Sequence, residues 1–262
     1  MKMKGSKIVK IALASLISVS LFGCSSSSSK TASASTTANN GKKQEIIIGI
    51  SPDYPPFDTL EDGKLTGFDY DMGEWIFKWF DDNGYNYSHT WKQMSFDTII
   101  SSIQAGQVDL GISGFTYAKD RKVEFSDPYY KSAQVALVNS DSDLKTTDDL
   151  KGKHLAAQLG ATGEDCAKEI DKDAMIVEDM GVGVQALKAK NVDAVVLDTA
   201  VAKNYAATGD YKVLDGTLLD ENTHIIAKEG NKKLIGDVNK ALKAFMASDD
   251  YSKLLDKYGI EQ

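Results

Sequence analysis

From residue 45 to the C-terminus, short apolar runs alternate with longer stretches in which apolar residues recur every three or four positions. The first run, Glu45–Ile50, is rich in isoleucine and is followed by prolines, so it predicts a buried strand. From Phe68 to Phe80 the spacing of three and four predicts an amphipathic helix that ends near Gly84.

The same alternation continues along the rest of the chain. Further strands are predicted at 87–91, 108–112, 155–157, 175–177, 192–197, 211–214 and 224–227. Further helices are predicted at 96–105, 163–170, 183–190, 232–247 and 250–257. Strand–helix–strand units build mainly parallel sheets with helices on both faces. Because a second series begins near Val135, the pattern predicts an α/β protein with two lobes.

The first 43 residues have a different composition. Four lysines precede the apolar stretch Ile11–Phe22, whose twelve residues fall short of the roughly 20 that a helix needs to cross a bilayer. A basic start and a short apolar run predict a secretory signal at 1–23. The stretch ends in Leu21-Phe22-Gly23-Cys24, which resembles the lipobox of bacterial lipoproteins, although Phe22 is bulkier than usual. We therefore expect lipidation of Cys24; the alternative is an ordinary signal peptide with a chance cysteine.

Residues 24–43 combine that cysteine with a Ser-, Thr-, Ala-, Asn- and Lys-rich segment, which predicts a flexible linker. No later stretch is apolar enough to span a membrane, so the lipid would be the only anchor. The folded part is then expected outside the cytoplasm, at the outer face of the cell membrane. Cys166, alone in an exported chain, is expected to be a small core residue and not a nucleophile.

Charge and composition exclude several classes of function. The 42% hydrophobic content of the 262 residues is typical of a globular protein. Residues 1–43 hold seven lysines and no acid, which leaves 23 basic against 38 acidic residues in the remainder. Such an acidic body disfavours nucleic-acid binding. Two cysteines make no disulfide framework, and three scattered histidines show no metal-ligand spacing, so no metal or cofactor is expected.

In α/β folds of this kind, ligands bind beyond the carboxyl ends of strands. Three of the four prolines fall in the segment Ser51–Phe57, which follows the first strand. Their fixed φ angles predict a stiff loop that could place Tyr54 against a small ligand. Phe57 is expected in the core, and the alternative for Tyr54 is the core as well.

Arg121 is the only arginine beside 29 lysines. Its planar guanidinium can bind a carboxylate by two parallel hydrogen bonds, which an ammonium cannot do. Thr116 adds a hydroxyl, and Gly114 allows a ligand to approach the backbone closely. These neighbours favour ligand binding over the alternative, a structural ion pair.

Two further strands are followed by polar residues. Gln158–Glu164 predicts a glycine turn that opens a helix with Thr162 at or near its N-cap, a place that favours an anion or is merely a cap. Asp198 could receive an ammonium or cap the next helix. With Tyr54 and Phe96 as an aromatic wall, these groups fit a zwitterionic α-amino acid.

Six segments, in order along the chain, resemble the polar amino-acid-binding proteins of bacterial ABC importers: Ser51–Phe57, Gly67–Asp71, Phe96–Ile100, Gly114–Arg121, Phe125–Tyr130 and Asp193–Asp198. The resemblance covers about 45–260. It implies two α/β lobes, 45–133 plus 226–262 and 134–225, joined by two hinge crossings. It also implies a monomer that closes over its ligand and then docks on a membrane permease.

The resemblance also implies roles for single residues. Arg121 and Thr116 would bind the α-carboxylate with Thr162, and Asp198 would bind the α-ammonium. Tyr54 and Phe96 would sandwich the ligand side chain, and the Gly114 backbone would accept from the ammonium. Gln158 stands where the distal side chain is read. Ser51 stands where relatives that prefer cationic ligands often carry an acid, so no strong preference for arginine or lysine is expected.

Binding, and not catalysis, is therefore the predicted activity, with three alternatives. The same module could sense amino acids for signalling. A dehydratase on this fold would need an acid and a base, for which Asp198 and Asp53 are candidates. Gly181–Ala186 matches a partial dinucleotide-binding motif.

Overall fold

The computed structural model describes residues 42–261. The predicted signal peptide and Cys24 lie outside these residues. Its strands are β1 (Gln44–Ile50), β2 (Thr59–Glu61), β3 (Lys64–Thr66), β4 (Tyr87–Gln93), β5 (Leu110–Thr116), β6 (Val123–Phe125), β7 (Tyr130–Asn139), β8 (Leu155–Gln158), β9 (Met175–Val177), β10 (Ala194–Asp198), β11 (Tyr211–Val213) and β12 (Leu219–Lys228). Its α-helices are α1 (Phe68–Asp82), α2 (Phe96–Gln104), α3 (Thr162–Ile170), α4 (Met180–Lys188), α5 (Thr199–Ala206), α6 (Lys232–Met246) and α7 (Asp249–Tyr258). Within this part of the chain no helix combines the length and the apolar content that a bilayer crossing requires.

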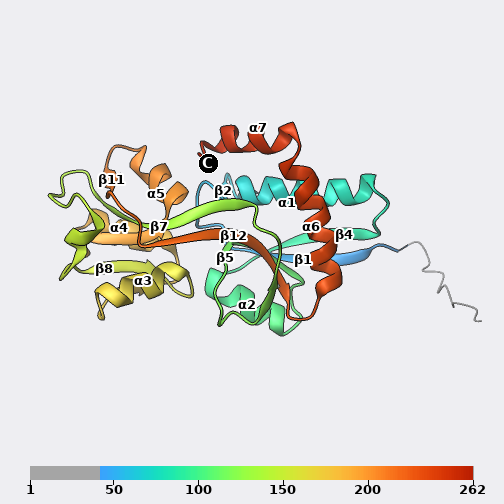
Figure 1. The fold of residues 1–262 in the computed structure, drawn as a ribbon, viewed down its shortest axis with the longest axis horizontal. Coiled ribbons are helices and arrows are strands. Elements are labelled where there is room, and N and C mark those ends of the chain that lie inside the picture. Colours follow the sequence, from blue (N-terminus) through green and yellow to red (C-terminus); the bar gives the residue numbers. More distant parts are fainter. Residues whose placement is uncertain (1–41, 262) are drawn as a thin grey trace, which may run out of the picture. The chain divides into compact units, whose positions relative to one another are not determined.

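One large sheet runs through the fold in the order β4-β1-β5-β12-β7-β10-β8-β9 (Figure 1). Its two flanks are parallel, since β1 pairs with β4 and β5, and β8 pairs with β9 and β10. In the middle, β7 and β12 pair antiparallel with each other and with the flanks. The parallel sheets predicted from the sequence are thus found on the flanks.

The strands β7 and β12 connect the two flanks. The N-terminal half of β7 pairs with β12, and the half from Gln134 onward pairs with β10. In return, β12 pairs with β7 over Leu219–Thr223 and with β5 from Thr223 onward. The chain therefore crosses between the flanks twice, once in each direction.

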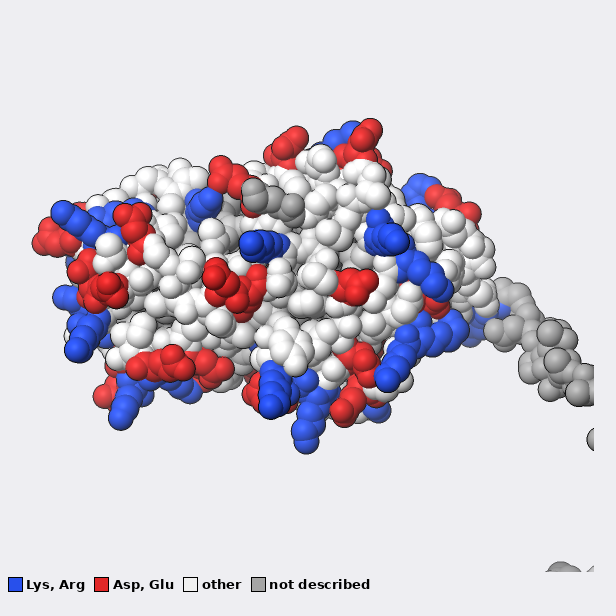
Figure 2. Space-filling view, viewed as in Figure 1, with Lys and Arg blue, Asp and Glu red and all other residues white. Residues whose placement is uncertain are grey.

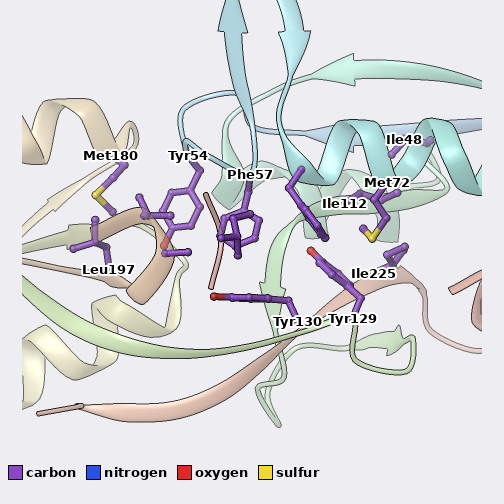
Figure 3. Packing of buried hydrophobic residues seen from close by; sticks show 14 of the residues in the cluster. Ile48, Tyr54, Phe57, Met72, Ile112, Tyr129, Tyr130, Met180, Leu197 and Ile225 are labelled. Carbon is purple, nitrogen blue, oxygen red and sulfur yellow. The ribbon is translucent and has the colours of Figure 1, made fainter. Parts of the chain in front are cut away.

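Alternating side chains of β1 show how the sheet is covered. Ile46 and Ile48 are fully buried with Met72 and Phe80 of α1, whereas Ile47 packs with the cluster that includes Ile99 of α2. This is the period-two alternation of a strand with helices on both faces. Figure 3 shows the first of these clusters, which continues from Ile48 and Met72 through Phe57 to Leu197.

Some predicted boundaries are corrected. The strand expected at 108–112 is β5, which continues to Thr116, and the strand expected at 224–227 is the much longer β12. The helix expected at 183–190 is α4 at Met180–Lys188. The hairpin of β2 and β3 was not predicted; its turn places Asp62 and Gly63 at positive φ.

Lysine and acidic side chains are interspersed on the face seen in Figure 2. Across residues 42–261 several lysines form exposed ion pairs, such as Lys203 with Glu261 and Lys190 with Asp141. Exposed pairs of this kind contribute little to stability. The charge pattern therefore bears on solubility more than on the fold.

Candidate ligand-binding site

All nine residues predicted to contact a ligand line one narrow cavity, whose volume of about 10 Å³ corresponds to about one water molecule. They are Ser51, Tyr54, Phe96, Gly114, Thr116, Arg121, Gln158, Thr162 and Asp198. Asp53, Ser113, Gln134 and Ala161 complete the lining. Most of these residues stand at or just after the ends of strands β1, β5, β8 and β10, where an α/β fold places its ligands.

Tyr54 and Asp198 are fixed against each other. The Tyr54 side chain is buried and extends toward Leu197 and Met180 (Figure 3). Its hydroxyl donates to Asp198 Oδ2, and the backbone N–H of Asp198 donates back to the Tyr54 oxygen at 3.1 Å. Ser132 Oγ donates to the other carboxylate oxygen at 2.6 Å. Burial raises the pKa of Asp198, and burial together with this carboxylate raises the pKa of Tyr54 well above its usual value.

Asp198 occupies the N-cap position of α5, but its side chain makes no capping bond. The carboxylate is therefore not used as a helix cap and remains in the cavity wall. Phe57, as expected, is in the core, 1% exposed.

Arg121 reaches across the cavity edge. Its guanidinium donates to the carbonyl oxygen of Thr116 at 2.6 Å and to that of Gly160 at 2.8 Å. The guanidinium carbon also lies 5.9 Å and 5.6 Å from the ring centroids of Phe96 and Phe115, within the range of cation–π attraction. Burial lowers the pKa of Arg121, and nearby acids, Glu221 first, oppose that shift. The group stays charged, and within residues 42–261 two of its five N–H donors form hydrogen bonds.

The end of β5 needs a glycine. Gly114 has φ +63°, and a side chain there would face the ring of Tyr54 at 3.7 Å. Its N–H donates to Asp69 Oδ2 at 2.7 Å, so only its carbonyl oxygen can serve a ligand. Ser113 Oγ accepts from the N–H of Ser51 at 3.0 Å and donates to Asp58 Oδ2 at 2.7 Å. The buried carboxyl groups of Asp69 and Asp58 thus hold the end of β5 by hydrogen bonds.

An acid that the sequence did not single out as a ligand-contacting residue lies beside Ser51 and Gln158. Asp53 accepts from Ser51 Oγ at 2.6 Å and from Gln158 Nε2 at 2.7 Å. The backbone N–H of Met180 donates to it at 3.0 Å. Burial is the main cause of its raised pKa. The sequence did contain a signal for this site residue, since Asp53 stands two positions after Ser51 in the same proline-rich loop.

Thr162 is the first residue of α3, directly after the N-cap Ala161, which agrees with its expected place at or near the N-cap. Its hydroxyl lies 3.3 Å from that of Thr116 and donates to Glu221 Oε2 at 2.8 Å. Gln134 Nε2 donates to Glu221 Oε1 at 2.6 Å. Ser132, Gln134 and Glu221 were missed because they lie within the connecting strands and not in a loop after a strand.

The partial dinucleotide motif lies elsewhere. Gly181 and Gly183 are inside the first turn of α4, without positive φ, and do not line the cavity. Across residues 42–261 no three His, Cys, Asp or Glu side chains are grouped as metal ligands would be. Cys166 of α3 is half-buried against the core, and burial raises its pKa to about 11, as expected for an unreactive thiol.

A polar cavity beside two crossing strands in a two-lobed α/β fold is the architecture of a solute-binding protein. Residues 46–261 match the bacterial extracellular solute-binding proteins, family 3, and the chain belongs to this family. A probable histidine-binding protein of Campylobacter jejuni is 34% identical over 225 residues, which cover 82% of this chain and 84% of the relative. The arginine-binding extracellular protein ArtP of Bacillus subtilis is 30% identical over 96% of this chain and 97% of its own.

Solved structures give the same result. An ancestral arginine-binding protein bound to glutamine has a TM-score of 0.73 and 34% identity, covering 83% of this chain and 98% of its own. The arginine-, lysine-, histidine-binding protein ArtJ of Geobacillus stearothermophilus has a TM-score of 0.76 and 29% identity, covering 84% and 96%. The family and the two-lobed fold that the sequence resembled are therefore confirmed.

Proposed function

We propose that this protein captures an α-amino acid in the cavity and delivers it to an ABC-type permease. The observation that carries the proposal is that a unique guanidinium, Arg121, and a buried carboxylate, Asp198, line the same cavity. A zwitterion needs a cationic group to bind its carboxylate and an anionic group to bind its ammonium. Relatives named as histidine-, arginine- and glutamine-binding proteins support this choice.

The head group of the ligand would be held by both charges. Arg121 and Thr116 bind the α-carboxylate together with Thr162, and Asp198 binds the α-ammonium. The Gly114 carbonyl oxygen accepts a further hydrogen bond from the ammonium. Tyr54 and Phe96 form the aromatic wall along the ligand side chain, as their places in the cavity lining allow.

The far end of the ligand would meet Ser51, Asp53 and Gln158. Asp53 supplies the acid that position 51 lacks, so this end favours a side chain with hydrogen-bond donors, foremost that of arginine. This differs from the expectation drawn from Ser51 alone. Relatives named as arginine-binding proteins support a donor-bearing side chain.

The cavity takes residues from both proposed lobes, 45–133 plus 226–262 and 134–225. Arg121 and Tyr54 belong to the first, and Thr162 and Asp198 to the second. A ligand that contacts both stabilises the closed form by differential binding, with β7 and β12 as the crossings that bend. Lipidation of Cys24 would keep the protein, as a monomer, at the outer face of the membrane and near its permease.

The experiment is isothermal titration calorimetry of the purified protein with the twenty amino acids and cystine. We expect one site, with micromolar or tighter affinity for at least one amino acid. Proton NMR of the mixture distinguishes binding from dehydratase chemistry, since a bound solute is recovered unchanged. No heat with any of these solutes, or their conversion to a product, would contradict the proposal.

A further inference from the structure

Glu221 is a buried acid directly behind the hydroxyl groups of the cavity. It lies in β12 and is 9% exposed. One carboxylate oxygen accepts from Thr162 Oγ1 at 2.8 Å and the other from Gln134 Nε2 at 2.6 Å. Thr162 Oγ1 in turn lies 3.3 Å from Thr116 Oγ1. Thr116, Thr162 and Gln134 line the cavity, so the acid is one hydrogen bond away from a ligand.

Hydrogen atoms in this group can be counted. A hydroxyl carries one hydrogen, and an ionised carboxylate carries none. When Glu221 is ionised, the hydroxyls of Thr162 and Thr116 are both drawn to its carboxylate. Neither hydroxyl is then free to donate to a ligand carboxylate. When Glu221 is protonated, it shares its proton with the neighbouring acceptors, Asp198 among them, and the two hydroxyl hydrogens can turn to the cavity.

Gln134 also has a buried hydrogen-bond acceptor that lacks a donor in the described chain. Its Oε1 atom is buried and has no hydrogen-bond partner within residues 42–261. The side-chain pair Glu221 and Gln134 therefore offers more buried acceptors than the adjacent donors supply. An added proton would satisfy this group, whereas an added anion alone would not.

We propose that Glu221 is a positioning residue that takes up a proton when the ligand carboxylate binds, which turns the hydroxyls of Thr162 and Thr116 toward that carboxylate. The inference rests on the proposed function, which places the ligand carboxylate beside Arg121 and Thr162. A second anion arriving next to a buried carboxylate disfavours its ionised form.

Four other titratable groups act on Glu221 or respond to it: Arg121 after β5, Asp198 in β10, Tyr54 after β1 and Cys166 in α3. Burial, with Asp198 next, raises the pKa of Glu221 to about 7, against the hydrogen bonds that lower it. A ligand ammonium would lower the raised pKa of Asp198 and release a proton there. The informative quantity is therefore the difference in proton uptake between the wild type and a variant at position 221.

The test is calorimetry with L-arginine near neutral pH in phosphate and in Tris, whose different ionisation enthalpies report the protons exchanged. Glu221→Gln keeps the shape and donates permanently from its amide to Thr162. We expect the wild type to take up close to one proton more than this variant. The affinity of the wild type for L-arginine should fall by up to about tenfold per pH unit above neutrality, whereas the affinity of the variant should stay constant. At about pH 8.5 the variant should bind more tightly than the wild type.

Asp220→Asn is the matched control, because it removes the same charge from the neighbouring, exposed position of β12. It should leave both proton uptake and pH dependence unchanged. Equal proton uptake in the wild type and Glu221→Gln, or weaker binding by that variant at every pH, would overturn the inference alone. If none of the twenty amino acids nor cystine binds the wild type, the proposed function fails and this inference with it. In infrared difference spectra of the wild type, a protonated carboxyl band from Glu221 should grow on binding while any from Asp198 shrinks, and this readout is independent of the variant's folding.

Discussion

Arg121 combines features that a lysine cannot supply together. Its planar guanidinium donates to two carbonyl oxygens and lies near the faces of two rings, and its further N–H groups can donate to a ligand. A lysine ammonium could keep one of these carbonyl contacts but not a bidentate bond to a carboxylate. The ligand should therefore depend on this residue more than the fold does.

We predict that Arg121→Lys weakens amino-acid binding by roughly 10- to 100-fold, the loss of a charge-assisted hydrogen bond of about 1.5–3 kcal/mol. The melting temperature of the unliganded protein should change little, because the contacts of Arg121 lie at the cavity edge and a lysine could keep one of them. Calorimetry and thermal unfolding of the same samples measure the two effects. Equal affinity in the variant would refute the role of Arg121.

A second prediction concerns Asp53 and the ligand side chain. Asp53→Asn keeps an acceptor for Gln158 and Met180 but removes the charge. We expect affinity for L-arginine to fall about tenfold or more, since a hydrogen bond to a charged group is lost, while affinity for L-glutamine changes little. The ratio of the two dissociation constants is the measurement. A uniform loss for both amino acids would show that Asp53 shapes the loop and does not read the side chain.

The loop after β1, strand β5 and helix α1 meet at two buried carboxyl groups. Asp58 and Asp69 are both fully buried, and Asp58 Oδ1 has no hydrogen-bond partner in the described chain. Burial and mutual repulsion raise the pKa of Asp58 well above its usual value, and burial raises that of Asp69 to about 7. In the unfolded chain both should ionise near pH 4. The folded protein thus binds more protons than the unfolded chain between about pH 4 and pH 7, and stability should fall as pH rises through this range.

We predict that Asp58→Asn reduces this fall, because one of the two raised groups no longer titrates. The free energy of unfolding from urea titrations at about pH 5 and pH 8 measures it. His224, whose burial lowers its pKa, acts in the opposite sense, so the comparison is between variant and wild type. Asp62→Asn in the exposed hairpin turn is the control. An unchanged pH dependence in Asp58→Asn would show that Asp58 is not the group responsible.

The elements that the sequence predicts well are those whose own pattern is clear. Helices α1, α2 and α6 repeat apolar residues at three and four, and β1 has four isoleucines among its seven residues, so period and composition agree. In contrast, Leu219 at the start of β12 is followed by Asp220, Glu221 and Asn222, polar residues that pair with β7. Only pairing between segments far apart in sequence makes them a strand. Glu221 and Gln134 could not be predicted as site residues for the same reason. Strand pairing, and not a loop after a strand, places them next to each other at the cavity.

The chain as a whole should respond to its ligand, because the cavity joins groups from both proposed lobes. Direct contacts already span it: Tyr54 to Asp198, Arg121 to Gly160, and Gln158 to Asp53. Each is a single contact that a ligand would reinforce or replace. A ligand that binds only the folded form at a thousandfold excess over its dissociation constant should add about 4 kcal/mol to the free energy of unfolding. For a domain of this size this corresponds to a rise of roughly 10 °C in the melting temperature.

The last prediction separates closure from stabilisation. If the lobes swing about β7 and β12, small-angle X-ray scattering should show a smaller radius of gyration when saturating L-arginine is added, and no such change in Arg121→Lys at the same ligand concentration. Hydrogen exchange should slow in the loops at 51–57, 116–122 and 158–164, whereas the parallel ladder of β1 and β4 should exchange as before, because it lies away from the crossings. A higher melting temperature without any change in the radius would mean that the ligand enters a cavity already closed, and that β7 and β12 hold the lobes in place and do not act as hinges.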